Sequence, residues 1–485
     1  MTALVLLLAC TAAPSGGGKD TAPPSTTSTT TPAPTTPAPT TSTTPTTPTA
    51  VQADCAVQPD NALRVDCTVR LDLERPVRIT ATQAGGWERE VASPAGVAHS
   101  LTLWGLYAEQ DVAWTAWVDG VALAEGVVRT GAIPPLLAEL NVTLAGDDPV
   151  VEHVLVPASC EGAPFLAIVD RDGAVVWYQD LEWDGEGSVG LANLTDDGGV
   201  VVIVDEGIQE WSLTGEHRRT LERGVHFDRR IHHDLFKHDD ILYALWADTV
   251  EVGRAEVVLD GLYLFDEADA VVGEWSLADH ISLEERDLVG LPPRGFWEDE
   301  FPGAVDWSHA NAVFVDDDGI TVSTRWISTV WRLAGFDSPR FGEVEWRLVG
   351  EQDSPIPADF VLESGLTDVL GFRGQHHATV SPGGLLSLFD NRRGADPSRA
   401  LAYALDPSAG VAELVAVHTL PQHCDVQGGA FIQDNGDMVA TCADTGVVYH
   451  YRAGGDGAES FSMGVQCGDF AGVRVVMPRA QPVAL

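Results

Sequence analysis

The stretch HANAVFVDDDGITVSTR (residues 309–325) contains two apolar runs separated by a D-D-G turn. Apolar runs of this length around such a turn are typical of two antiparallel strands joined by a hairpin. The pattern recurs in both directions along the chain, in six units: Phe165–Tyr178, Gly190–Trp211, His232–Trp275, His309–Leu348, a unit beginning at Gln375, and Val426–Tyr451. Six units without helical periodicity predict an all-β fold with a six-bladed β-propeller over residues 146–485.

A smaller β-domain is expected before the propeller, over residues 51–145. Hydrophobic and polar residues alternate there in strand fashion, in the runs Arg64–Leu73, Val77–Gln83, His99–Leu106 and Val112–Val118. About seven short strands would fit this length. The segment LWGLYAEQDVAWTAWV (103–118) resembles the later strands of an immunoglobulin or fibronectin type III sandwich. We therefore predict a small Ig/fibronectin-III-like β-sandwich with a packing or spacer role.

The first fifty residues predict export and anchoring. The apolar run 3–9 is too short to span a bilayer but suits the hydrophobic region of an export signal. The run L-L-A-C ending at Cys10 resembles a bacterial lipobox, so residues 1–20 are interpreted as a signal with lipidation at Cys10, although the leader lacks Lys and Arg before it. A cleaved leader without lipid is the alternative. Residues 21–50 are nearly all Thr, Pro, Ser and Ala, which predicts a disordered tether between a membrane anchor and the exported domains.

Composition excludes several partners. The 485 residues include 28 basic and 72 acidic side chains, a net charge of −44. Nucleic acids and anionic membrane surfaces bind basic patches, so neither is an expected partner of the folded domains. A hydrophobic content of 45% is enough for a core.

Cysteine usage predicts disulfides. Besides Cys10 the chain has an even set, Cys55, Cys67, Cys160, Cys424, Cys442 and Cys467, none with metal-ligand spacing. In an exported chain this favours pairing, with buried free thiols as the alternative. We predict the pairs Cys55–Cys67, Cys424–Cys442 and Cys160–Cys467, the last joining the two ends of the large domain.

The repeat brings histidines into register. In a propeller the innermost strand of each blade lines the central channel. Alignment of the units on their turns places His232-His233, Ser308-His309, Gln375-His376-His377 and Gln427 at the starts of successive inner strands. Arg325 lies at the far end of the unit that His309 opens, and Asn311 and Asn391 lie in the same zone. These side chains are expected to converge at one mouth of the channel.

Such a cluster suits transfer of an anionic group. Neutral histidine can act as a nucleophile or, when protonated, as an acid near neutral pH. Arginine is a planar, permanently charged donor for sulfate, phosphate or carboxylate oxygens. Three histidines also suit zinc, but the nearby arginine would repel a cation, so we predict no metal. No G-x-S-x-G, H-E-x-x-H, Walker A or dinucleotide-binding motif occurs.

Three strings together resemble a known family: DWSHANAV…VSTRWISTVWRL (306–333), GQHHATV…LSLFDNRR (374–393) and QGGAFIQDNGDMVAT (427–441). They are similar to the motifs of the bacterial arylsulfotransferases that do not use phosphoadenosine phosphosulfate (PAPS). The resemblance spans about residues 160–470 and implies an exported six-bladed propeller behind a small β-domain. It further implies ping-pong sulfuryl transfer from an aryl sulfate donor to a phenolic acceptor, through a sulfohistidine and without a cofactor.

The resemblance assigns roles residue by residue. The nucleophile falls on His376, with His377 as the ambiguous neighbour, and the first family histidine falls on His233, beside His232. His309 would move the proton, and Arg325 with His233 would hold the sulfuryl oxygens. His232, Asn311, His377 and Asn391 are predicted to contact substrate.

The chain also departs from the family pattern. Ala312 replaces a serine, KHDD (237–240) replaces an N-G turn, and a long acidic stretch, Leu277–Trp307, precedes His309. A lipid-anchored propeller that binds a ligand or protein without turnover, and a metal-dependent propeller hydrolase, remain the alternative functions. The oligomeric state is left open by the sequence.

Overall fold

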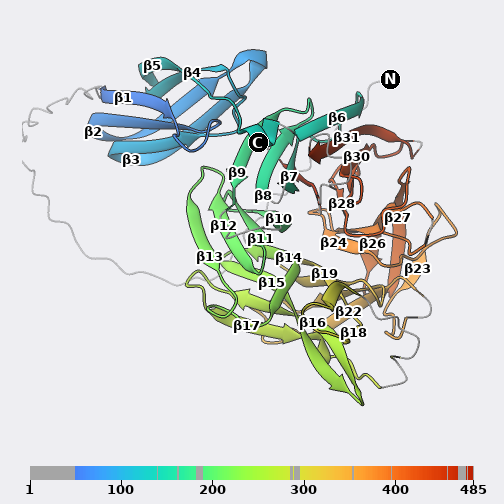
Figure 1. Cartoon of the computed structure of the whole chain (residues 1–485). Coiled ribbons are helices and arrows are strands. Elements are labelled where there is room, and N and C mark those ends of the chain that lie inside the picture. The colour runs from blue at the N-terminus through green and yellow to red at the C-terminus, as the bar shows by residue number, and fades with distance from the viewer. Residues whose placement is uncertain are drawn as a thin grey trace, which may run out of the picture. The chain divides into compact units, whose positions relative to one another are not determined.

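The computed structural model describes residues 50–483, except 139, 161–162, 182–188, 285–287, 289–294, 352–353, 395, 456, 468–476 and 478. The predicted signal region, Cys10 and nearly all of the tether lie outside these residues. Strands dominate the described part of the chain, and its one α-helix is the short α1 (Pro135–Ala138) (Figure 1). None of the helices in this part has the length and apolar character needed to cross a membrane. The predicted all-β class is therefore confirmed.

The first sheet contains five strands: β1 (Ala50–Val57), β2 (Val65–Thr82), β3 (Glu88–Leu103), β4 (Asp111–Val118) and β5 (Val121–Arg129). Fewer and longer strands form than the sequence pattern suggested, because β2 and β3 continue through positions expected to be turns. The disulfide Cys55–Cys67 joins directly opposed residues of β1 and β2, as predicted. A two-sheet sandwich remains a prediction for this region.

The later strands form six further sheets in which consecutive strands pair in antiparallel fashion. The first contains β7 (His153–Cys160), β8 (Ala163–Asp170) and β9 (Val175–Asp180), and the next contains β10 (Val189–Thr195), β11 (Gly199–Val204), β12 (Gly207–Ser212) and β13 (His217–Leu221). The third contains β14 (Arg230–His238), β15 (Ile241–Val252), β16 (Ala255–Phe265) and β17 (Val271–Ser276), and the fourth contains β19 (Ala310–Asp316), β20 (Gly319–Thr324), β21 (Thr329–Leu333) and β22 (Val344–Val349). The last two contain β24 (His376–Val380), β25 (Leu385–Asp390), β26 (Arg399–Asp406) and β27 (Val411–Thr419), and β28 (Gly429–Ile432), β29 (Met438–Cys442), β30 (Val447–Tyr451) and β31 (Glu459–Cys467). The disulfide Cys424–Cys442, also as predicted, ties the segment before β28 to the end of β29.

Aspartates explain why the turns form where the sequence has D-G or D-x-x motifs. Asp170 Oδ1 accepts the backbone N–H groups of Asp172 at 3.0 Å and Ala174 at 2.7 Å. Between them Gly173 adopts φ +85°, which glycine reaches without steric cost. Asp266 caps the β16–β17 turn in the same way, so these carboxylates replace backbone partners that a tight turn leaves unpaired.

Both ends of the large β-region add a strand to a sheet formed from the opposite end of the chain. β6 (Leu140–Gly146) pairs with β31, and β32 (Gln481–Val483) pairs with β7. The side chains of Cys160 and Cys467 lie outside the described part of the structure, so their predicted disulfide remains a prediction. The pairing of β6 with β31 and of β32 with β7 already joins the two ends of this region.

The first strands of successive sheets lie side by side. β7 contacts β10, β10 contacts β14, β14 contacts β19, β19 contacts β24, and β24 contacts β28. Residues that open these strands are consequently brought together, although they are far apart in the sequence.

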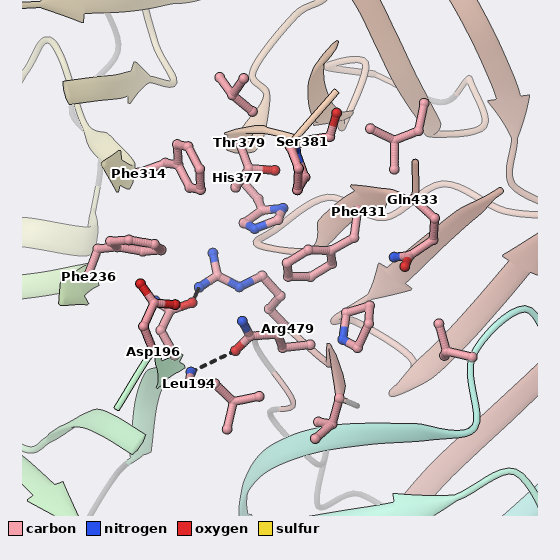
Figure 2. Close-up of a pocket in the computed structure, with 18 of the residues that line it drawn as sticks. Leu194, Asp196, Phe236, Phe314, His377, Thr379, Ser381, Phe431, Gln433 and Arg479 are labelled. Atoms are coloured by element: carbon pink, nitrogen blue, oxygen red, sulfur yellow. Dashed lines mark hydrogen bonds between the residues drawn. The ribbon is translucent and has the colours of Figure 1, made fainter. Parts of the chain in front are cut away.

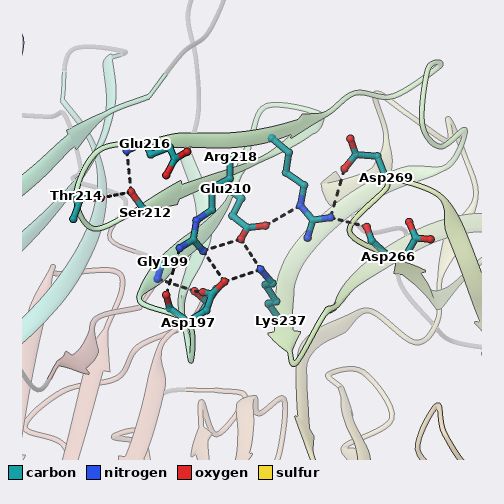
Figure 3. Close-up of polar contacts among 12 residues, drawn as sticks. Asp197, Gly199, Glu210, Ser212, Thr214, Glu216, Arg218, Lys237, Asp266 and Asp269 are labelled. Carbon is teal, nitrogen blue, oxygen red and sulfur yellow. Dashed lines mark hydrogen bonds and ion pairs between the residues drawn. The ribbon is translucent and has the colours of Figure 1, made fainter. Parts of the chain in front are cut away.

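A buried ion-pair network joins two of these sheets (Figure 3). Glu210 on β12 is 2% exposed, and it accepts hydrogen bonds from Lys237 Nζ at 2.7 Å and Arg219 Nε at 2.8 Å. Burial raises the pKa of Glu210, but the hydrogen bond from Lys237 and the charge of Arg219 outweigh it and leave the pKa below its usual value. Lys237 opens the KHDD segment, so this departure from the family pattern supplies a cation for the interface between sheets.

Replacing Glu210 tests this network. We expect Glu210→Gln to lower the free energy of unfolding by about 3 kcal/mol, because Lys237 and Arg219 would lose their buried carboxylate and keep only the more exposed Asp197 and Asp269. Urea unfolding followed by tryptophan fluorescence measures the change. Glu90→Gln, which breaks the exposed pair with Arg78, is the matched control and should change stability by less than about 1 kcal/mol. Equal effects of the two variants would contradict the prediction.

Candidate active site

The segments that open four successive sheets share an unusual backbone conformation. His233, His309, His377 and Gln427 have φ values of 54°, 54°, 52° and 50°. This left-handed region is uncommon for residues with a side chain and often marks functional sites. The pairing register shifts beside each of the three histidines, which re-aims adjacent side chains.

The sequence left open which of His376 and His377 corresponds to His233 and His309, and the backbone conformation gives that place to His377. The side chains nevertheless bring His376 into the group. The ring centroids of His233 and His309 are 4.7 Å apart, and those of His233 and His376 are 6.5 Å apart. Three sheets therefore contribute one histidine each to a single cluster, which we call the histidine cluster.

His377 lies elsewhere. Its ring is 4.2 Å from that of Phe431, and its Nδ1 lies 3.1 Å from both the backbone N and O of Ala430. It lines a different cavity, described below. Of the two adjacent histidines that the sequence left open, the structure thus places His376 in the cluster.

Asn391 fixes the orientation of the His376 ring. The Asn391 amide donates to the carbonyl oxygens of Cys424 at 2.8 Å and Gln427 at 3.0 Å, so its Oδ1 faces His376. That oxygen is 2.7 Å from His376 Nδ1, which must therefore carry the proton and donate it. His376 Nε2 is then left with a lone pair, and it has no hydrogen-bond partner among the described residues.

The His376 ring is held in its neutral form. Burial, and after it the positive charge of Arg325, lowers the pKa of His376 well below its usual value. Burial and the neighbouring imidazoles lower the pKa of His233 in the same way. A neutral imidazole with an unpartnered, unprotonated nitrogen is the state that a nucleophile requires.

His309 is paired with a carboxylate. Its Nδ1 lies 2.6 Å from Asp306 Oδ2, and both side chains are buried. The same oxygen accepts the Trp326 Nε1–H at 2.8 Å, which holds the carboxylate in place. Asp306 ends the two-residue strand β18 (Val305–Asp306), which pairs in parallel with β16. An imidazole oriented by a buried carboxylate is a suitable general acid and base.

His232 lies against His233 rather than beside the other rings of the cluster. The two Nδ1 atoms are 2.8 Å apart, and His232 Nε2 lies 3.0 Å from Asp260 Oδ1. Asp260 is 1% exposed and also accepts the backbone N–H of Ala310 at 2.8 Å. His232 therefore links His233 to a buried carboxylate and orients it.

Arg325 supplies positive charge to the cluster. Its backbone N–H donates to the carbonyl of His309 at 3.0 Å, and its Nη2 donates to the carbonyl of Asp425 at 2.6 Å. The guanidinium lies 4.3 Å from the centre of the Trp326 ring. Arg373, Arg392 and Arg393, in contrast, all lie near carboxylates of Glu351 or Asp396.

Asn311, which was predicted to contact substrate, forms a buried hydrogen bond between two sheets. Its amide donates to the Gln375 carbonyl at 2.6 Å, and the residue is 1% exposed. It thereby joins β19 to the residue preceding β24.

The long segment before His309 provides an aromatic wall. Phe296 lies 4.9 Å from both His233 and His309, and Trp297 lies 4.9 Å from His232, measured between ring centroids. Phe296 is 55% exposed although it is apolar. These residues and Gln427 border a cavity of about 540 Å³ that His232 and His233 also line. Within the described residues, no group of three or more His, Cys, Asp or Glu side chains is arranged to hold a metal ion.

Sequence reasoning did not identify Asp306, Asp260, Phe296 or Trp297. Asp306 had a detectable signal, since it lies three residues before His309 in the string DWSH. Asp260 and Phe296 had none, because their contacts cross between segments distant in sequence.

Solved structures resemble the chain only loosely. A Bacteroides caccae protein of unknown function has 10% identity and a TM-score of 0.42, covering 69% of this chain and 100% of that one. The Pseudomonas aeruginosa periplasmic gluconolactonase has 10% identity and a TM-score of 0.37, covering 70% and 99%. A catalytically inactive virginiamycin B lyase from Staphylococcus aureus has 10% identity and a TM-score of 0.35, covering 66% and 91%.

Sequence comparison is more specific. No curated protein matches the chain significantly. The family model described as Arylsulfotransferase (ASST) matches residues 142–440, more than half of the chain. The match includes His233, His309, Arg325, His376 and Asn391. The chain therefore belongs to the arylsulfotransferase family.

Proposed function

We propose that this chain transfers a sulfuryl group from an aryl sulfate ester to a phenol in two steps, through a sulfohistidine at His376. The observation that carries the proposal is the orientation of the His376 ring. Its Nδ1 donates to Asn391, so its Nε2, on the far side of the ring from Asn391, is unprotonated and without a hydrogen-bond partner among the described residues. Membership in the arylsulfotransferase family supports the reaction class.

We also propose that the six later sheets form a six-bladed β-propeller, preceded by a small Ig-like β-domain. Successive contacts between the first strands of these sheets support a radial arrangement. The exchange of β6 and β32 between the chain ends supports closure of the ring.

In the first step His376 Nε2 attacks the sulfur, an N–S bond forms, and the S–O bond to the aryl group breaks. Protonated His309 gives its proton to the departing phenolate and becomes neutral. In the second step His309 takes the proton of the incoming phenol, whose oxygen attacks sulfur and displaces neutral His376. Protons and charge balance over the two steps, and ping-pong kinetics follow.

Three groups assist the transfer. The Asp306 carboxylate compensates the positive charge that His309 carries while it holds the transferred proton. Arg325 and His233 are placed near His376 to stabilise charge that develops on the sulfuryl oxygens. In phosphoryl transfer, which passes through a similarly loose transition state, positioning and electrostatic stabilisation by such groups supply most of the catalysis.

We propose that the protein is exported and anchored by a lipid at Cys10. The disulfides Cys55–Cys67 and Cys424–Cys442 support an oxidising compartment. The short apolar run before Cys10 and the tether behind it support the anchor.

The nucleophile is tested with 4-nitrophenyl sulfate and phenol. We expect His376→Ala to lower the transfer rate by at least about a thousandfold, because the variant lacks the nitrogen that would form the N–S bond. Mass spectrometry of the wild-type chain quenched with donor alone should find sulfate on His376. His377→Ala is the matched comparison and should keep most of the activity. Loss of activity in His377→Ala with retention in His376→Ala would move the nucleophile to His377.

Arg325 is tested through the pH profile. Because burial and Arg325 both hold the pKa of His376 low, the wild-type rate should persist below pH 6.5, about the pKa of free histidine. Arg325→Gln removes the positive charge, so the pKa of His376 should rise and the acid limb of the kcat/KM profile should move to higher pH. We also expect a lower kcat, because Arg325 no longer stabilises the sulfuryl oxygens. Arg129→Gln, which changes an exposed arginine of the first sheet, should leave the profile unmoved. An unmoved acid limb in Arg325→Gln would refute this electrostatic role.

Asp306 is tested by varying the leaving group. We expect Asp306→Asn to lower kcat by about 10²-fold or more. The defect should be larger with phenyl sulfate than with 4-nitrophenyl sulfate, since the poorer leaving group depends more on protonation by His309. Asp396→Asn, a change at an exposed carboxylate, is the control. An equal defect with both donors would indicate that Asp306 does not act through proton transfer.

A further inference from the structure

A second and larger cavity is separate from the one beside the histidine cluster. It has a volume of about 950 Å³, and it shares no lining residue with the cavity beside the histidine cluster. His377 lines it, whereas its neighbour His376 belongs to the cluster. This volume is within the range of small-molecule sites.

Aromatic side chains from three sheets form the walls. Phe236 on β14 and Phe314 on β19 lie with ring centroids 5.1 Å apart, at an interplanar angle of 60°. In Figure 2 they lie on one side of the cavity, and Phe431 of β28 lies on the other. All three rings are only partly buried. The exposed parts of these rings provide apolar area for a ligand to cover. Phe236 and Phe314 also offer ring faces, whereas Phe431 already has His377 at 4.2 Å and the Arg479 guanidinium at 6.0 Å from its centroid.

The cavity carries an excess of negative charge. Glu152, Asp196 and Asp434 line it and are exposed. Glu152 pairs with Arg171 at 3.0 Å, whereas neither Asp196 nor Asp434 forms an ion pair with any described residue. The arginine of the cavity, Arg479, is already paired with Asp234 at 3.1 Å. Burial lowers the pKa of both lining histidines, His153 and His377, so neither adds positive charge near pH 7.

Aromatic faces together with unpaired carboxylates select the charge of a ligand. A cation over a ring face is attracted by the ring quadrupole, and nearby carboxylates add to this attraction. An anion such as an aryl sulfate would meet carboxylates without a free cation to balance them. We propose that this cavity is a second binding site that takes a small aromatic compound carrying an ammonium group, independently of sulfuryl transfer.

Calorimetric titration of the full chain with 2-phenylethylamine near pH 7 tests the proposal. We expect saturable binding at millimolar concentrations or below, and no binding of 3-phenylpropionate, which keeps the ring but carries a carboxylate. Phe431→Ala should weaken the affinity about tenfold, and Asp434→Asn, a change at an exposed position, should weaken it several-fold. Phe296→Ala, in the cavity of the histidine cluster, is the matched control and should bind normally.

Three outcomes would overturn the proposal. One is no saturable binding of 2-phenylethylamine to the wild-type chain. Another is equal binding of 3-phenylpropionate. The third is loss of binding in Phe296→Ala with normal binding in Asp434→Asn, which would place the amine in the other cavity. Because Asp434→Asn alters only a surface carboxylate, the test does not depend on Phe431→Ala folding.

Discussion

The architecture depends on one buried ion pair between Asp234 and Arg479. The two residues are 1% and 2% exposed, and Arg479 donates to both carboxylate oxygens at 3.1 and 3.3 Å. Asp234 on β14 also accepts the Val313 N–H of β19, and Arg479 also donates to Asn193 of β10. A buried charge without its partner costs several kcal/mol, so the charges are compensated only when the C-terminal segment is seated among the inner strands. The same segment also supplies β32 to the first of the six sheets, so one stretch of chain both compensates the buried charge and joins the chain ends.

The candidate site lies at strained backbone positions, where the first strands of successive sheets begin. A regular strand would direct adjacent side chains to opposite faces of its own sheet. The left-handed residues His233, His309 and His377, with the register shifts beside them, instead send His376 to the histidine cluster and His377 to a separate cavity. Two neighbouring residues thus serve two environments. Such strain persists because hydrogen bonds to the neighbouring sheet hold these segments in place: Asn391 donates to the carbonyls of Cys424 and Gln427, and Asp260 accepts the backbone N–H of Ala310.

Electrostatics around the histidine cluster differ from those of the chain as a whole. The chain has a net charge of −44, and nearby arginines such as Arg373 and Arg392 lie against carboxylates. Arg325 donates to a neutral carbonyl and stacks on Trp326, and its charge contributes, after burial, to the low pKa of His376. The proposed transfer from an anionic ester requires such a local positive field within an acidic protein, and field lines concentrate in a cavity with low-dielectric walls.

The sequence by itself determined the all-β class, the strand–turn–strand units, two disulfides and the segments that bring histidines together, because these depend on local alternation, turn chemistry and motif order. It left open whether His376 or His377 enters the cluster, because a bulge leaves no mark in the hydrophobic pattern. Only the tertiary structure separated His376 from His377, paired His309 with Asp306, and brought Phe296 to the cluster. Those relations arise from contacts between segments far apart in the chain, and their geometry is set by how whole sheets pack around the buried Asp234–Arg479 pair.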